Sequence, residues 1–74
     1  MADEYVIHKP PYRWVIMRMT VKGGPPFYAV KKYRYFTRIG KSIFGKIVGS
    51  YGELKAAYPS ISAQIDKAIP KDKR

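Results

Sequence analysis

The most regular pattern of hydrophobic and polar positions lies between residues 12 and 21, where every second side chain from Val15 to Val21 is apolar. This alternation is typical of a β-strand that buries one of its faces. The even-numbered positions are mixed, because they carry Arg18 and Thr20 beside Trp14 and Ile16. We therefore predict a strand over 12–21 whose odd-numbered side chains face the core, namely Val15, Met17, Met19 and Val21.

A second predicted strand, 27–36, follows the turn signal Gly23-Gly24-Pro25-Pro26 and is rich in aromatic residues. Its odd-numbered set contains one cation, Lys31, whereas its even-numbered set contains Lys32 and Arg34. Because burying fewer cations costs less, we expect the odd-numbered set to face the core. The two strands are expected to pair in antiparallel orientation through the intervening turn.

Residues 37–49 fit two alternatives. The apolar side chains of Ile39, Ile43, Phe44, Ile47 and Val48 have helical spacing. Three glycines in the same stretch would each cost about 0.8–1 kcal/mol inside a helix. These glycines favour the other alternative, a turn over 38–41 followed by a third strand over 42–48.

The C-terminal segment has helical patterning in two short pieces. Ser50 and Glu53 have the spacing of a capping box, which predicts a helix that begins at Tyr51 and ends at Pro59. Ser60 is then predicted to cap a second helix over 61–69. The apolar face of this second helix consists of Ile61, Ile65, Ala68 and Ile69.

These elements predict an α+β fold, with a two- or three-stranded antiparallel sheet packed against a C-terminal helix or two short helices. A chain of 74 residues has room for one core. Because Pro10 and Pro11 interrupt any ladder, residues 1–11 are expected to form an extended arm, with Tyr5-Val6-Ile7 as a short edge strand at most. The domain then spans 12–69, and 70–74 are expected to form a frayed basic tail.

The charge distribution bears on function. The chain has 15 Lys and Arg against 5 Asp and Glu, a formal net charge of +10, and no acidic residue between positions 5 and 52. Surfaces without a special task usually mix both signs of charge. An external polyanion is therefore indicated, and nucleic-acid phosphate is the favoured partner ahead of an acidic protein or a membrane surface.

The sequence lacks the residues that several kinds of catalytic and metal-binding site require. Without cysteine there is no disulfide, thiolate metal site or thiol nucleophile, and His8 is the one histidine. Gly40-Lys41-Ser42 resembles part of a phosphate loop, but Tyr35 stands where that motif needs glycine. We expect neither enzyme activity nor a metal or cofactor. No stretch approaches a membrane span or a secretory signal, so a cytoplasmic, nucleoid or nuclear protein is expected rather than a secreted one.

The predicted facing leaves a sheet surface on which cations alternate with aromatic rings, a combination that binds phosphates and bases. We predict a non-catalytic nucleic-acid-binding protein, with DNA slightly preferred over RNA, in an accessory role in transcription, recombination or chromosome architecture. Core packing is the alternative role for each ring. The candidate binding residues are Arg13, Trp14, Arg18, Tyr28, Lys32, Arg34, Arg38, Lys41 and Lys46.

Two alternatives stay open. Ile16 and Val30 on the same surface would suit a protein contact, so the chain is alternatively an adaptor or inhibitor that docks on an acidic protein, or a homodimer. A helix-turn-helix with 60–69 as its reading helix is less favoured, because that helix has no arginine and contains Asp66.

Overall fold

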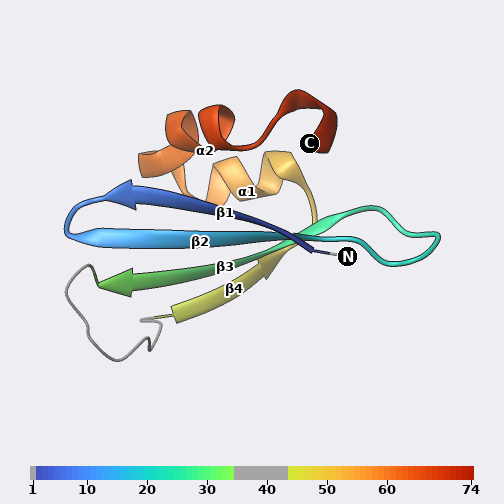
Figure 1. Cartoon of the computed structure of the whole chain (residues 1–74), viewed down its shortest axis with the longest axis horizontal. Helices are drawn as coiled ribbons and strands as arrows, with labels where there is room; N and C mark the ends of the chain where they lie inside the picture. Colours follow the sequence, from blue (N-terminus) through green and yellow to red (C-terminus); the bar gives the residue numbers. More distant parts are fainter. Residues whose placement is uncertain (1, 35–43) are drawn as a thin grey trace.

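The fold is a four-stranded antiparallel sheet with two short helices on one of its faces (Figure 1). The structure is a computed structural model that describes residues 2–34 and 44–74. Strands β1 (Ala2–Lys9), β2 (Tyr12–Met19), β3 (Phe27–Arg34) and β4 (Phe44–Val48) each pair with their neighbour in the chain. Helices α1 (Tyr51–Ala57) and α2 (Ser62–Ala68) follow, with short 3-10 turns η1 (Pro59–Ile61) and η2 (Lys71–Lys73). The predicted α+β class is thus confirmed.

The sheet has one strand more than the sequence pattern indicated. The expected arm, 1–11, contains β1, which pairs with β2 from Ala2↔Met19 to Lys9↔Tyr12. Pro10 and Pro11 form the turn between the two strands, and the peptide bond that joins them is cis. Strand β4 lies within the predicted third strand. The predicted turn over 38–41, with residues 42 and 43, lies outside the described residues.

The predicted facing of the two central strands is wrong. The even-numbered side chains of Trp14, Ile16, Tyr28 and Val30 are buried, each less than 7% exposed, beneath the helices. The odd-numbered side chains of β2 are half-buried or exposed on the other face, and Val21 lies beyond the strand with 56% of its surface exposed. The number of cations on a face did not indicate which face is buried, because long side chains can bury their stems while their charged ends stay near the edge of the core.

The two helices supply the other half of the core. Leu54 of α1 is fully buried, and so are Ile61, Ile65 and Ile69 of the predicted apolar face of the second helix. The fourth member of that face, Ala68, is half-buried against them. Burying one such side chain contributes about 1.5–3 kcal/mol. The ring of Tyr58 packs edge-on against Trp14, with ring centroids 5.3 Å apart.

The helix ends follow the predicted capping in part. Ser50 Oγ accepts a hydrogen bond from the Glu53 amide at 3.1 Å, and Glu53 Oε2 accepts one from the Gly49 amide at 3.2 Å. The pair thus caps α1 as expected, although the carboxylate reaches one residue further back than in a standard capping box. Pro59 follows the end of α1. The prediction that Ser60 caps the second helix is wrong, because Ser60 lies inside η1 and α2 begins at Ser62.

The C-terminal residues pack on the domain, in contrast to the frayed tail that the sequence suggested. Arg74 donates hydrogen bonds to the carbonyl oxygens of Asp66 at 2.6 Å and Ile69 at 3.1 Å. Its guanidinium also lies 5.1 Å from the centre of the Tyr51 ring. These contacts fold the end of the chain back onto α2.

Candidate nucleic-acid interface

Positive charge gathers at the end of the sheet near the β1–β2 turn. The antiparallel register places Lys9, Tyr12 and Arg34 in one cross-strand row, and the next three rows add His8, Arg13, Lys32 and Lys31. None of these four rows contains an acidic residue. We call the cations of these rows the cationic end: Lys9, Arg13, Lys31, Lys32 and Arg34.

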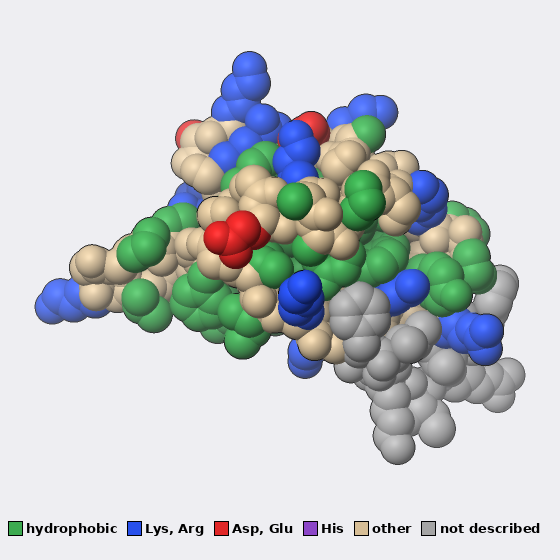
Figure 2. All heavy atoms as spheres, turned by 180° about the vertical axis from the view of Figure 1, so that it is seen from behind, with side chains coloured by type: hydrophobic (Ala, Val, Ile, Leu, Met, Phe, Trp, Pro, Cys, Tyr) green, Lys and Arg blue, Asp and Glu red, His purple; other side chains and the backbone are tan. Residues whose placement is uncertain are grey.

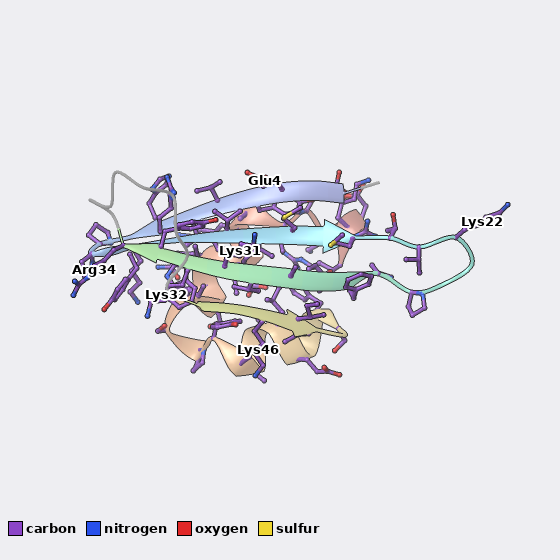
Figure 3. All side chains as sticks on the ribbon, turned by 90° about the horizontal axis from the view of Figure 1, so that it is seen from below. Glu4, Lys22, Lys31, Lys32, Arg34 and Lys46 are labelled. Carbon is purple, nitrogen blue, oxygen red and sulfur yellow. The ribbon has the colours of Figure 1, made fainter. Side chains whose placement is uncertain are left out.

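Both acidic residues of the sheet lie toward its opposite end. Glu4 is in the row of Met17, and Asp3 is opposite Arg18, with Asp3 Oδ2 at 3.7 Å from the Arg18 guanidinium. Figure 3 shows the separation along the sheet, with Arg34 and Lys32 near one end and Lys22 at the tip of the β2–β3 hairpin beyond the other. The sheet is therefore polarised along its strands.

Two predicted aromatic ligands are inside the protein. Trp14 is 6% exposed and Tyr28 is 1% exposed, because both lie under the helix layer. A buried ring has no face on which a base can stack. The role predicted for these two rings is therefore corrected: they are core residues, which was the alternative that the sequence offered for each.

Arg18, a third predicted ligand, is held by the end of the chain. Its Nε donates a hydrogen bond of 2.6 Å to the Lys73 carbonyl oxygen, which also accepts one from the Tyr28 hydroxyl at 3.2 Å. The Arg18 side chain is 16% exposed. These contacts make Arg18 a link between the sheet and the C-terminal segment.

Lys32 and Lys46 both point to the side of the sheet that the helices cover. The Lys32 ammonium lies 3.8 Å from the centre of the Tyr12 ring and 4.8 Å from that of Trp14. Lys46 is exposed on the edge strand β4, opposite Val30. Arg38 and Lys41 lie outside the described residues, so the interface is built without them.

Arg13 and Arg34 are the predicted residues that the structure leaves exposed at the cationic end. The Arg13 guanidinium lies over the ring of Tyr33, 4.8 Å from its centre. Lys31 and Tyr33 were missed, since the odd-numbered set of β3 was assigned to the core. Their outward position follows from the alternation along β3, because Tyr28 and Val30 point inward.

The face of the sheet that points away from the helices is largely apolar; we call it the open face. Val6 and Ile47 are 43% and 69% exposed on it. Figure 3 looks onto this face and places Lys31 near its middle, while Figure 2, from another side, shows hydrophobic side chains exposed between Lys and Arg. The described side chains of the open face are Glu4, Val6, His8, Arg13, Val15, Met17, Met19, Phe27, Ala29, Lys31, Tyr33 and Ile47.

Two hollows lie side by side on the open face. The first, of about 490 Å³, is lined by apolar Val6, Val15 and Met17 together with Arg13, Tyr33 and other polar residues. The second, of about 470 Å³, lies over β3 and β4, where Ala29 and Gly45 have small side chains or none. Lys31 lines both hollows.

The helix layer neutralises one of the acidic residues internally. Asp66 accepts hydrogen bonds from the Tyr51 hydroxyl at 2.6 Å and from Lys55 Nζ at 2.9 Å. The first of these, and then the second, lowers the pKa of Asp66 below its usual value. Burial, followed by the bond to Asp66, raises the pKa of Tyr51 to about 12. Asp66 is therefore already paired and does not offset the cationic end.

Within residues 2–34 and 44–74, no cluster of three or more His, Asp or Glu side chains is arranged to hold a metal ion. Over the same residues, no helix has the length and apolar character needed to span a membrane. No protein-family model matches the chain, and no significant match exists among curated proteins or solved structures. The chemistry of the described residues is therefore the basis for a functional proposal.

Proposed function

We propose that this chain is a non-catalytic nucleic-acid-binding protein that contacts phosphate through the cationic end of its sheet. One observation carries the proposal: four consecutive cross-strand rows hold Lys9, Arg13, Lys31, Lys32 and Arg34 and contain no acidic residue. Three of these cations, Arg13, Lys31 and Arg34, are exposed, and the cross-strand rows in which they lie hold no carboxylate.

The spacing of these residues makes the charges act together. Four rows and three strands cover roughly 10 Å in each direction, from the usual rise per residue and distance between strands. This is close to the screening length at physiological salt, about 8 Å, so the cations repel one another when no counter-ion is bound. A phosphate backbone relieves this repulsion and releases its own condensed cations, which favours binding.

Binding should be measured by fluorescence anisotropy with labelled single-stranded DNA, duplex DNA and RNA from about 50 to 200 mM salt. We expect log affinity to fall linearly with log salt, with a slope of several units. Arg13→Ala and Arg34→Ala should each reduce this slope by about one, because each removes one phosphate contact.

Lys22→Ala is the matched control, because it removes the same charge from the exposed hairpin tip beyond the opposite end of the sheet. Its slope should equal that of the unchanged protein. Binding that does not respond to salt would overturn the proposal. An equal loss in Lys22→Ala would show that net charge, rather than the cationic end, attracts the nucleic acid.

The exposed apolar side chains of Val6 and Ile47 favour a second candidate, a module that docks on an acidic protein. Such docking would draw its affinity from desolvated apolar contacts, so Ile47→Ala would weaken it strongly. In the nucleic-acid proposal, contact with duplex phosphate barely depends on Ile47. Salt-dependent duplex binding that Ile47→Ala leaves unchanged supports the nucleic-acid candidate, whereas absence of duplex binding by the unchanged protein supports docking on an acidic protein.

A further inference from the structure

The two hollows of the open face bring apolar and charged side chains together. The first is lined by the apolar side chains of Val6, Val15 and Met17, with Arg13, Lys31 and Tyr33 beside them and with Glu4 and His8 on β1. Its volume of about 490 Å³ lies within the usual range for ligand sites. An apolar surface beside cations suits a ligand that has a flat or apolar part and also carries negative charge.

Planar groups in the first hollow narrow the ligand further. The Arg13 guanidinium lies over the Tyr33 ring at 4.8 Å, so two flat groups lie together at the cationic end. Unpaired bases stack on aromatic rings and on guanidinium planes. A nucleotide, with a flat base and a charged phosphate, matches this combination of groups.

Lys31 lies between the two hollows of the open face. Because Lys31 lines both hollows, its ammonium group can serve a phosphate that lies between them. The order hollow, cation, hollow is the order of base, phosphate, base along a single strand. We propose that the open face binds single-stranded nucleic acid, with unpaired bases in the two hollows and the phosphate between them at Lys31; this inference rests on the function proposed above.

A duplex cannot use the open face in this way. Each base of a duplex is covered on both faces by its neighbours and paired along its edge, so no base can lie flat on Val15 or Met17. Duplex binding is then confined to phosphate contacts at the cationic end. The open face therefore adds affinity for the single strand alone.

The test compares a labelled single strand with the duplex of the same sequence, using Tyr33→Leu and Gly45→Val. Tyr33→Leu removes a stacking ring without changing charge, and should weaken single-strand binding about tenfold at an unchanged salt slope. Gly45→Val fills the second hollow. A Cβ at position 45 would lie at ordinary contact distance, 3.7 Å, from the Val30 carbonyl oxygen, and valine is a favoured strand residue, which suits this substitution to β4. It should weaken single-strand binding several-fold.

Phe27→Leu is the matched control, since it removes a ring from the open face outside both hollows. Phe27→Leu should bind the single strand as tightly as the unchanged protein does. The affinity for the duplex should be the same in every one of these variants. Tyr33→Phe should retain single-strand affinity, because it keeps the ring. Thermal unfolding of each variant shows whether a loss of binding is merely a loss of fold.

Equal affinity for single strand and duplex, with no effect of Tyr33→Leu or Gly45→Val, would overturn this inference. If Arg34→Ala still lowered the salt slope in that case, the proposed function would stand without it. Absence of salt-dependent binding to any nucleic acid would overturn both. A concentration-dependent dimer in sedimentation that Gly45→Val abolishes would assign the open face to a second copy of the chain, and would also overturn the inference.

Discussion

The ammonium group of Lys32 lies 3.8 Å from the centre of the Tyr12 ring, on the face of the sheet that the helices cover. It is also 4.8 Å from the centre of the buried Trp14 ring. Its neighbour Lys31 points to the open face and is exposed. Two successive lysines thus have different tasks, one in packing against aromatic rings and the other at the candidate interface.

Substituting Lys31 and Lys32 one at a time should separate the effect on folding stability from the effect on nucleic-acid binding. Lys32→Gln loses the contact with two rings, and we expect it to lower the free energy of unfolding by about 1 kcal/mol. Lys31→Gln should leave stability within about 0.5 kcal/mol and lower the salt slope of binding by about one. Urea unfolding and anisotropy measure the two effects. Equal destabilisation by both changes would contradict the assigned faces.

Ile16 and Met17 offer the same comparison on β2. Ile16 is fully buried, so Ile16→Ala should cost about 2–5 kcal/mol of unfolding free energy. Met17 is half-buried on the open face, and Met17→Ala should cost about 1 kcal/mol. Urea titrations of the two variants measure both losses of unfolding free energy. A larger loss for Met17 would mean that the open face is covered in solution.

Arg18 should behave as a structural residue although it carries the charge of a phosphate ligand. Arg18→Gln removes the hydrogen bond to the Lys73 carbonyl oxygen and the pairing with Asp3, so we expect a loss of about 1–3 kcal/mol. The salt slope of binding should stay unchanged below the unfolding transition. A slope lower by one at full stability would return Arg18 to the interface.

Asp66 should make the protein sensitive to acid. Its pKa is lowered in the folded state, so its contribution to stability is complete above the usual aspartate pKa of 3.8 and is lost as pH falls through the lower folded value. Asp66→Asn should be less stable than the unchanged protein near neutral pH. The difference should shrink below about pH 4. Thermal unfolding across this range measures it, and a constant difference would contradict the pairing with Tyr51 and Lys55.

Tyr51 should act at the alkaline end. Its pKa of about 12 lies above the ordinary value of 10.0, so its contribution is complete below pH 10 and is lost as pH rises toward 12. Tyr51→Phe should remove this part of the alkaline loss of stability. Thermal unfolding of both proteins as pH rises from 10 toward 12 measures this loss of stability, and spectroscopic titration of tyrosine ionisation reports the pKa itself. Tyr58, whose pKa burial also raises, is retained in the variant as an internal reference.

The secondary structure was largely predictable because it depends on local signals. Glycines and prolines separate the strands, and Ser50 with Glu53 is a start signal that the structure uses. The edge strand β1 was harder to predict. Its pairing with β2 depends on a two-residue turn at Pro10 and Pro11, residues whose usual effect is to interrupt a ladder.

The candidate site was less predictable, because it depends on which face of the sheet the helices cover. The choice rested on avoiding Arg18 and Lys32 in the core, but both have partners there, the Lys73 carbonyl oxygen and the Tyr12 ring. These partners are distant in sequence or come from a neighbouring strand, so no local pattern reveals them. The lack of acidic residues between positions 5 and 52, by contrast, is visible in the sequence itself. The strand register then brings the cations of this stretch together at one end of the sheet.

The strand order β1-β2-β3-β4 also has a consequence for how the chain acquires its fold. Each strand joins the one synthesised just before it, so the sheet can form through successive hairpins at a small cost in loop entropy. The contact that closes the domain is of another kind, since α2 returns to the first strand and Lys9 Nζ donates to the Ser60 carbonyl oxygen, 51 residues away. We expect formation of the hairpins to be fast and the docking of α2 on β1 to come last. Weakening that docking should chiefly accelerate unfolding rather than slow folding.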